Sequence, residues 1–174
     1  MEFSVEKSLE ILTRTPKVLR DLLDGLSDDW TMDNEGPDTW SAFDIMGHLI
    51  HGEKTDWTPR LQIILSELEN KAFEPFDRFA QFENSKGKSL SDLLNEFEVL
   101  RKLNIDLLKS KQITSLDLVK TGIHPAFGAV TLAQLLSTWT VHDLNHLAQI
   151  SRVMSKQYLH AVGPWKEYLG ILNR

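Results

Sequence analysis

Apolar residues recur every three to four positions in four long segments of the chain, over residues 4–25, 41–68, 89–109 and 131–157. This spacing places the apolar side chains on one face of a helix, so each segment predicts an amphipathic helix. Such helices bury their apolar faces against one another, and four of them in 174 residues predict an all-α four-helix bundle. We expect residues 1–174 to form a single domain.

Prolines and capping residues indicate where these helices begin and bend. Pro16 predicts a kink in the first helix, with a restart capped by Thr15, and Pro59 predicts a kink near the middle of the second. Ser41 and Asp44 have the spacing of a capping box, as do Thr131 and Gln134 at the start of the fourth helix. Pro164 suits the first position of a short C-terminal helix.

Long crossover loops are expected between the helices. Phe73, Phe76, Phe79 and Phe82 recur every three residues in a segment without clear periodicity. Their rings either pack a loop onto the bundle or form a wall over a pocket, and one loop can do both. Residues 112–130 are marked by glycine and proline as a second crossing loop. No segment shows a convincing strand pattern.

Two histidines interrupt the apolar stripe of the fourth helix. His142 and His146 follow Trp139 at steps of three and four, so both imidazoles occupy core positions. Residues four apart are neighbours on one face, so both rings can bind one ion. If the second helix faces the fourth, His48 supplies a third nitrogen, and Gly52 leaves open space one turn beyond it. The alternative is that these histidines are core residues hydrogen-bonded to backbone or carboxylate groups.

Other polar residues carry weaker signals. His51 shares part of the face of His48 and is expected to support the site or the fold, and Glu53 can accept a hydrogen bond from a ligand or act as a base near bound water. Asp143 points away from its neighbour His142, towards a cap, a salt bridge or solvent. Asp56 and Arg60 have the spacing of a surface ion pair. His124 is expected to lie in a loop, and nothing in the sequence around His160 indicates a function.

Composition excludes several classes of partner and chemistry. The net charge of -6 gives the chain no general attraction to nucleic acid or anionic membranes. No apolar run approaches the roughly 20 residues that span a bilayer, and the N-terminal residues lack a signal-peptide pattern, so we expect a cytoplasmic protein. The chain has no cysteine, so any metal must be held by nitrogen or oxygen ligands.

Three stretches together resemble the DinB-like superfamily: "TWSAFDIMGHLIHGEKTDW", "WTVHDLNHLAQI" and "YLHAVGPWKEYL". The resemblance covers nearly the whole chain, and no motif residue is missing. It implies a four-helix bundle in which His48, His142 and His146 bind a divalent transition metal, with nickel or zinc ahead of iron or manganese. It also implies a homodimer, which agrees with the extra apolar residues Leu144 and Leu147 outside the core stripe of the fourth helix.

The reaction is left open by this resemblance, because relatives include thiol-dependent transferases and metal-dependent hydrolases. A metal with an open position can bind an external low-molecular-weight thiol for transfer to a small electrophile, and this is the reaction we favour at this point. The same site can acidify water for hydrolysis. A non-catalytic metal or small-molecule binding module is the third alternative. For a small-molecule substrate, Trp57, Phe76 and Phe79 are the candidate contacts.

Overall fold

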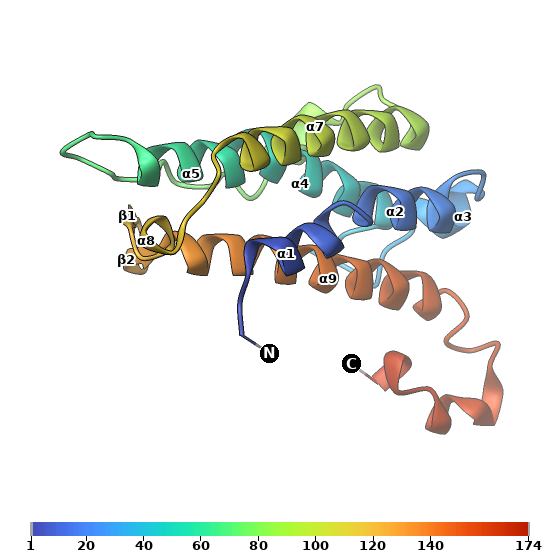
Figure 1. Ribbon diagram of the computed structural model, residues 1–174. Helices are drawn as coiled ribbons and strands as arrows, with labels where there is room; N and C mark the ends of the chain where they lie inside the picture. Colours follow the sequence, from blue (N-terminus) through green and yellow to red (C-terminus); the bar gives the residue numbers. More distant parts are fainter. Residues whose placement is uncertain (1, 174) are drawn as a thin grey trace.

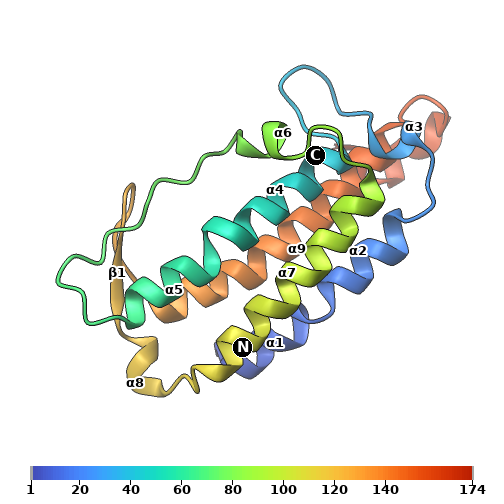
Figure 2. The same cartoon turned by 90° about the horizontal axis from the view of Figure 1, so that it is seen from above.

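A computed structural model describes residues 2–173 and contains the four expected helical runs. They are α1 and α2 (Val5–Leu12, Thr15–Leu23), α4 and α5 (Ala42–Thr55, Trp57–Leu65), α7 (Leu90–Ser110) and α9 (Leu132–Lys156). The α4–α5 run lies beside α7 and α9, while α2 packs on α7 and α1 on α9 (Figure 1). Viewed from above, α4, α5 and α7 run in one direction, and α1, α2 and α9 run in the other (Figure 2). The four-helix bundle predicted from the hydrophobic pattern is confirmed.

Local sequence explains the ends and breaks of these runs. The capping boxes at Ser41 and Thr131 both form, so the first amide groups of α4 and α9 have hydrogen-bond partners. The first run breaks before Thr15, and Pro16 lies in the first turn of α2, where a missing N–H costs nothing. The kink predicted at Pro59 is displaced: the second run breaks at Asp56, and Pro59 lies in the first turn of α5.

The connecting segments hold more structure than their sequences suggested. Three short helices lie in them: α3 (Asp28–Thr31), α6 (Ala80–Asn84) and α8 (Ser115–Leu118). The prediction that the chain has no strands was wrong, because β1 (Thr121–His124) and β2 (Gly128–Thr131) form an antiparallel hairpin in the second crossing loop. The short C-terminal helix is confirmed, with Pro164 in its first turn: the segment forms two 3₁₀ helices, η1 (Gly163–Tyr168) and η2 (Gly170–Asn173).

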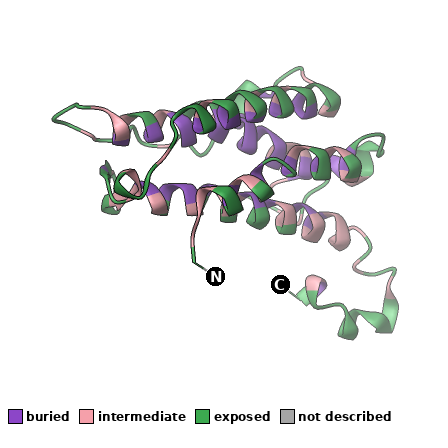
Figure 3. Ribbon diagram, in the orientation of Figure 1, coloured by how far each residue is buried: buried purple, intermediate pink, exposed green. Residues whose placement is uncertain are grey.

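The core consists of two groups of buried apolar side chains along the bundle axis. One contains Leu19, Ile45 and Phe97, and the other contains Leu12, Trp57 and Trp139. Buried residues follow the inner faces of the helices, as Figure 3 shows. No helix within residues 2–173 is both long enough and apolar enough to cross a membrane.

One arginine lies inside this core and joins four helices, because its Nη1 also donates to the Leu12 carbonyl oxygen at the end of α1, at 3.0 Å. Arg101 of α7 is 1% exposed, and its Nη2 donates to Glu53 Oε1 of α4 and to Asp143 Oδ1 of α9, each at 2.8 Å. Burial opposes its charge, but the two carboxylates outweigh burial and raise the pKa of the guanidinium above its ordinary value. Trp139 Nε1 and Asn104 Nδ2 donate to Glu53 as well, at 3.0 and 2.9 Å. These hydrogen bonds fix α4 and α9 relative to α7.

We predict that Arg101→Met lowers the free energy of unfolding by about 3–5 kcal/mol, because it leaves two buried carboxylates without their counter-charge. Lys102→Met is the matched control, since Lys102 is the next residue of α7 and its partner Asp106 is exposed. Its urea midpoint should stay close to that of the unchanged protein. Equal shifts of the urea midpoint in the two variants would show that the buried network does not stabilise the bundle.

Candidate metal centre

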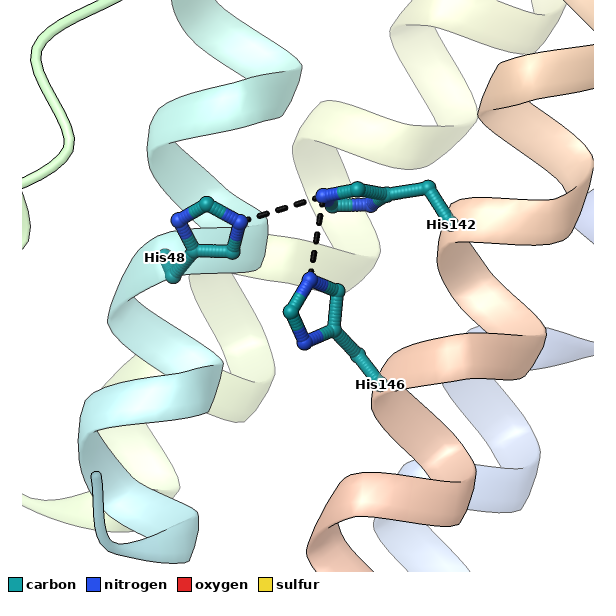
Figure 4. Close-up of side chains that lie close together, drawn as sticks. All are labelled: His48, His142 and His146. Carbon is teal, nitrogen blue, oxygen red and sulfur yellow. Dashed lines mark hydrogen bonds between the residues drawn. The ribbon is translucent and has the colours of Figure 1, made fainter. Parts of the chain in front are cut away.

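The three histidines selected by spacing meet between α4 and α9. His48 projects from α4, and His142 and His146 project from consecutive turns of α9, with their rings directed towards one another (Figure 4). His142 Nε2 lies 3.1 Å from Nε2 of both His48 and His146. Ligands bound at about 2.1 Å to one tetrahedral or octahedral ion lie roughly 3.0–3.4 Å apart, so this spacing fits a shared ion.

The surroundings keep these imidazoles neutral. Burial, together with the positive charge that His146 would carry, lowers the pKa of His48 to about 3 and that of His142 to about 2. Burial also lowers the pKa of His146, against the opposing effects of Gln149 and Asp143. Neutral rings offer the lone pairs that a metal requires. The donor set therefore fits a divalent transition metal on geometry and on charge.

Gln149 orients one of the three rings. His146 Nδ1 lies 2.7 Å from Gln149 Oε1, and a neutral imidazole that donates from Nδ1 leaves Nε2 free as a ligand. Within the described residues, the buried Nδ1 atoms of His48 and His142 have no hydrogen-bond partner. Sequence analysis missed Gln149, although its position three residues after His146 places it on the same helical face.

Aromatic rings surround the cluster. The Trp57 ring lies 5.0 Å from that of His142 and stacks on Trp139 at 5.9 Å. The open space expected beside Gly52 is absent: a Cβ at that position would lie 3.2 Å from Trp57 Nε1, because the indole fills the room that the glycine leaves. Gly52 thus allows Trp57 to approach α4 and to pack beside the histidines.

The two residues proposed to support the ligands lie in different surroundings. Glu53 is 2% exposed, and its carboxylate accepts from Arg101, Asn104 and Trp139, so its hydrogen bonds connect helices. His51 is also buried and packs against Phe76, with ring centroids 4.8 Å apart. Neither belongs to the three-histidine cluster. The salt bridge that was one alternative for Asp143 exists, but it is buried with Arg101.

A cleft of about 1430 Å³ opens in front of the histidines. His48, His142 and His146 line it, and so do the three candidate contacts Trp57, Phe76 and Phe79. The phenylalanine-containing loop therefore both packs on the bundle, through buried Phe73, and walls the cleft. The Asp56–Arg60 pair was wrongly placed at the surface, because its side chains are only 13% and 9% exposed and line the same cleft.

We predict that acid destabilises the metal-free protein partly through its histidines. Unfolded His48 and His142 bind protons with a pKa of about 6.5, whereas in the folded chain they stay neutral down to about pH 3 and 2. Stability is therefore full above pH 6.5 and falls below it, by about 1–2 kcal/mol per histidine at pH 5. Urea unfolding with chelator at pH 7.5 and 5.0 measures this loss. The loss of stability between pH 7.5 and 5.0 should be smaller when His48 and His142 are both changed to Gln. The same loss should be unchanged in the control His160→Gln, since His160 is exposed. A double variant as acid-sensitive as the unchanged protein would contradict the account.

Comparisons with known proteins identify the family of the chain. The solved structure of YfiT from Bacillus subtilis matches with a TM-score of 0.74 at 20% sequence identity, covering 90% of this chain and 90% of that chain. YfiT is described as a probable metal-dependent hydrolase with an unusual four-helix bundle topology. At this identity the likeness establishes the fold. No curated protein matches the chain. The family model of the DinB superfamily matches residues 11–150, and the chain belongs to that superfamily.

Proposed function

We propose that this protein is a metal-dependent hydrolase of a small molecule, with His48, His142 and His146 as the metal ligands. The observation that carries the proposal is the convergence of three neutral imidazoles, whose ligand nitrogens lie within 4.8 Å of one another at the wall of a large cleft. The described structural relative, a probable metal-dependent hydrolase, supports the same reaction class.

The ligand chemistry limits the choice of metal. Three imidazoles without thiolate or carboxylate suit zinc and nickel, whereas magnesium and calcium prefer oxygen ligands. Iron and manganese remain compatible with imidazole ligands but are usually accompanied by a carboxylate. Among residues 2–173, the cluster contains no fourth histidine, cysteine, aspartate or glutamate. Three protein ligands are typical of catalytic sites and distinguish them from closed structural sites.

The residues around the cluster give the site its further properties. A bound divalent ion supplies Lewis-acid chemistry, which acidifies water and polarises a carbonyl group. Gln149 orients the His146 ring, and the Trp57 ring packs edge-on against the His142 ring. Trp57, Phe76 and Phe79 present apolar surface to a small-molecule substrate.

Thiol transfer, which the family resemblance favoured, stays a prediction that the same assay tests. Metal-loaded protein is incubated with ester and amide substrates without thiol, and separately with an electrophile such as monochlorobimane and several low-molecular-weight thiols. We expect hydrolysis without thiol. His146→Ala should lower the affinity for the metal and the rate of hydrolysis, each by about 100-fold or more. Loss of a hydrogen-bond partner of a ligand typically weakens metal binding by about 10–100-fold, and loss of the ligand itself should weaken it at least as much.

His160→Ala is the matched control, because it removes an exposed imidazole and should change neither metal content nor rate. Thiol-dependent product without hydrolysis would replace the hydrolase by the transferase. Full metal occupancy in His146→Ala would contradict the ligand set. Silence in both assays, with metal bound and its coordination closed, would indicate a binding module.

We also propose that the chain forms a homodimer through the exposed side of α9. Val141 and Leu144 are 62% and 46% exposed and lie three residues apart on that helix. Leu147, which the sequence analysis grouped with Leu144, instead packs partly against the core. Burying two exposed apolar side chains favours association of two copies. Sedimentation should give a dimer at micromolar concentration and a monomer for Val141→Asp with Leu144→Asp, and a monomeric unchanged protein would refute the proposal.

A further inference from the structure

A second polar cluster lies in the same cleft, at the end away from the histidines. Two walls lead to it in steps of four residues, one along α4 and α5 and one along α9. The first wall contains His48, Gly52, Asp56 and Arg60, and the second contains His142, Thr138 and Gln134. Because the α4–α5 run and α9 are antiparallel, both walls lead from the histidines towards the β1–β2 hairpin (Figure 2).

Arg60 is the central residue of this cluster. Its side chain is 9% exposed, its Nε lies 2.6 Å from Asp56 Oδ1, and its guanidinium lies over the Phe73 ring at 5.2 Å from the centroid. Nη2 reaches the Glu74 carbonyl oxygen at 3.5 Å, which is a long hydrogen bond. Within residues 2–173, Nη1 of Arg60 has no hydrogen-bond acceptor. The guanidinium is thus held in place while part of its donor fork is unused.

His124 at the end of β1 adds a second donor. Its Nδ1 accepts a hydrogen bond from the Ala126 amide at 3.1 Å. Burial, followed by the charge of Arg60, lowers the pKa of this ring and favours its neutral form. Because Nδ1 accepts a hydrogen bond, the neutral ring carries its proton on Nε2. The ring stacks on Phe127 at 4.5 Å and meets the edge of Phe73 at 6.4 Å, which holds it at the cleft wall.

The wall between the two ends of the cleft combines apolar side chains with Thr138. Trp57 and Leu135 contribute side chains to it, and Gly52 contributes none. Arg60 follows His48 by twelve residues, or about 18 Å along an unbroken helix. The break at Asp56 and the length of the arginine side chain reduce the span, so a ligand on the order of 10–15 Å long would reach from one end to the other.

We propose that Arg60 and His124 bind a carboxylate, and that the substrate is an amphipathic acid with this carboxylate at one end and the hydrolysable bond at the histidine end. The histidine end rests on the proposed function, whereas the carboxylate site does not require the metal. Both side chains offer N–H donors, and a guanidinium fork matches the two oxygens of a carboxylate. Asp56 already offsets one positive charge, which favours a monoanion over a phosphate dianion.

Binding to the metal-free protein tests the carboxylate site separately from catalysis. The probes are 4-phenylbutyrate and the matched alcohol 4-phenylbutanol, with affinities measured by calorimetry. The protein should bind the acid about tenfold or more tightly than the alcohol, because charge-assisted hydrogen bonds exceed neutral ones. Arg60→Met combined with Asp56→Asn removes both partners of the ion pair and should abolish this preference.

Three controls keep this result interpretable. Unchanged affinity for the alcohol shows that the double variant is folded with an intact cleft. Arg60→Lys retains the charge without the fork and should keep part of the preference. Arg78→Met removes an exposed cation at the same cleft and should keep all of it. Equal affinity of the unchanged protein for acid and alcohol, or a preference that survives in the double variant, would overturn the proposal.

The metal-loaded enzyme then provides the kinetic test. Aryl esters that differ only in a terminal carboxylate or its methyl ester should differ about tenfold or more in kcat/KM, and the difference should vanish in the double variant. Hydrolysis of both esters at equal rates would overturn the carboxylate site and leave the hydrolase intact. Acid-selective binding without hydrolysis of either ester would support the carboxylate site and refute the hydrolase.

Discussion

The buried charge of Arg101 is the constraint on which the arrangement of the bundle depends. A guanidinium at 1% exposure requires nearby carboxylates, and Glu53 of α4 and Asp143 of α9 supply them. These helices also carry the three histidines: Asp143 is the residue after His142, and Glu53 lies five residues after His48. One ion network therefore fixes the relative position of the two helices whose side chains form the candidate metal centre.

The same interior determines the chemistry of the histidines. Trp57 and Trp139 stack beside the cluster, and the cleft, which Trp57 also lines, opens in front of it. Burial lowers the pKa of each imidazole in the cluster, so the rings remain neutral ligands at ordinary pH. Packing thus stabilises the fold and at the same time prepares three lone pairs for a cation, with apolar surface beside them for a substrate.

Sequence periodicity predicted the four helical runs and brought His48, His142 and His146 together, because a 3.6-residue repeat defines which side chains share a buried face. It did not identify what each buried residue contacts. Arg101 follows Phe97 by four residues on the buried face of α7, so helical spacing alone predicts that it is buried. Its partners come from distant segments, which helical spacing does not identify. Periodicity likewise does not specify the neighbours that place Trp57 beside Gly52 and direct Arg60 into the cleft. The β1–β2 hairpin was not predicted because each strand has only four residues, too few to show a clear alternating pattern.

The central claim is that three imidazole nitrogens bind one metal ion. X-ray absorption spectroscopy of the protein loaded with one equivalent of zinc tests it directly. The account predicts three nitrogen ligands at about 2.0–2.1 Å with the outer-shell scattering of imidazole rings, falling to two in His142→Ala. A spectrum that contains oxygen ligands alone, or one that His142→Ala leaves unchanged, would contradict it.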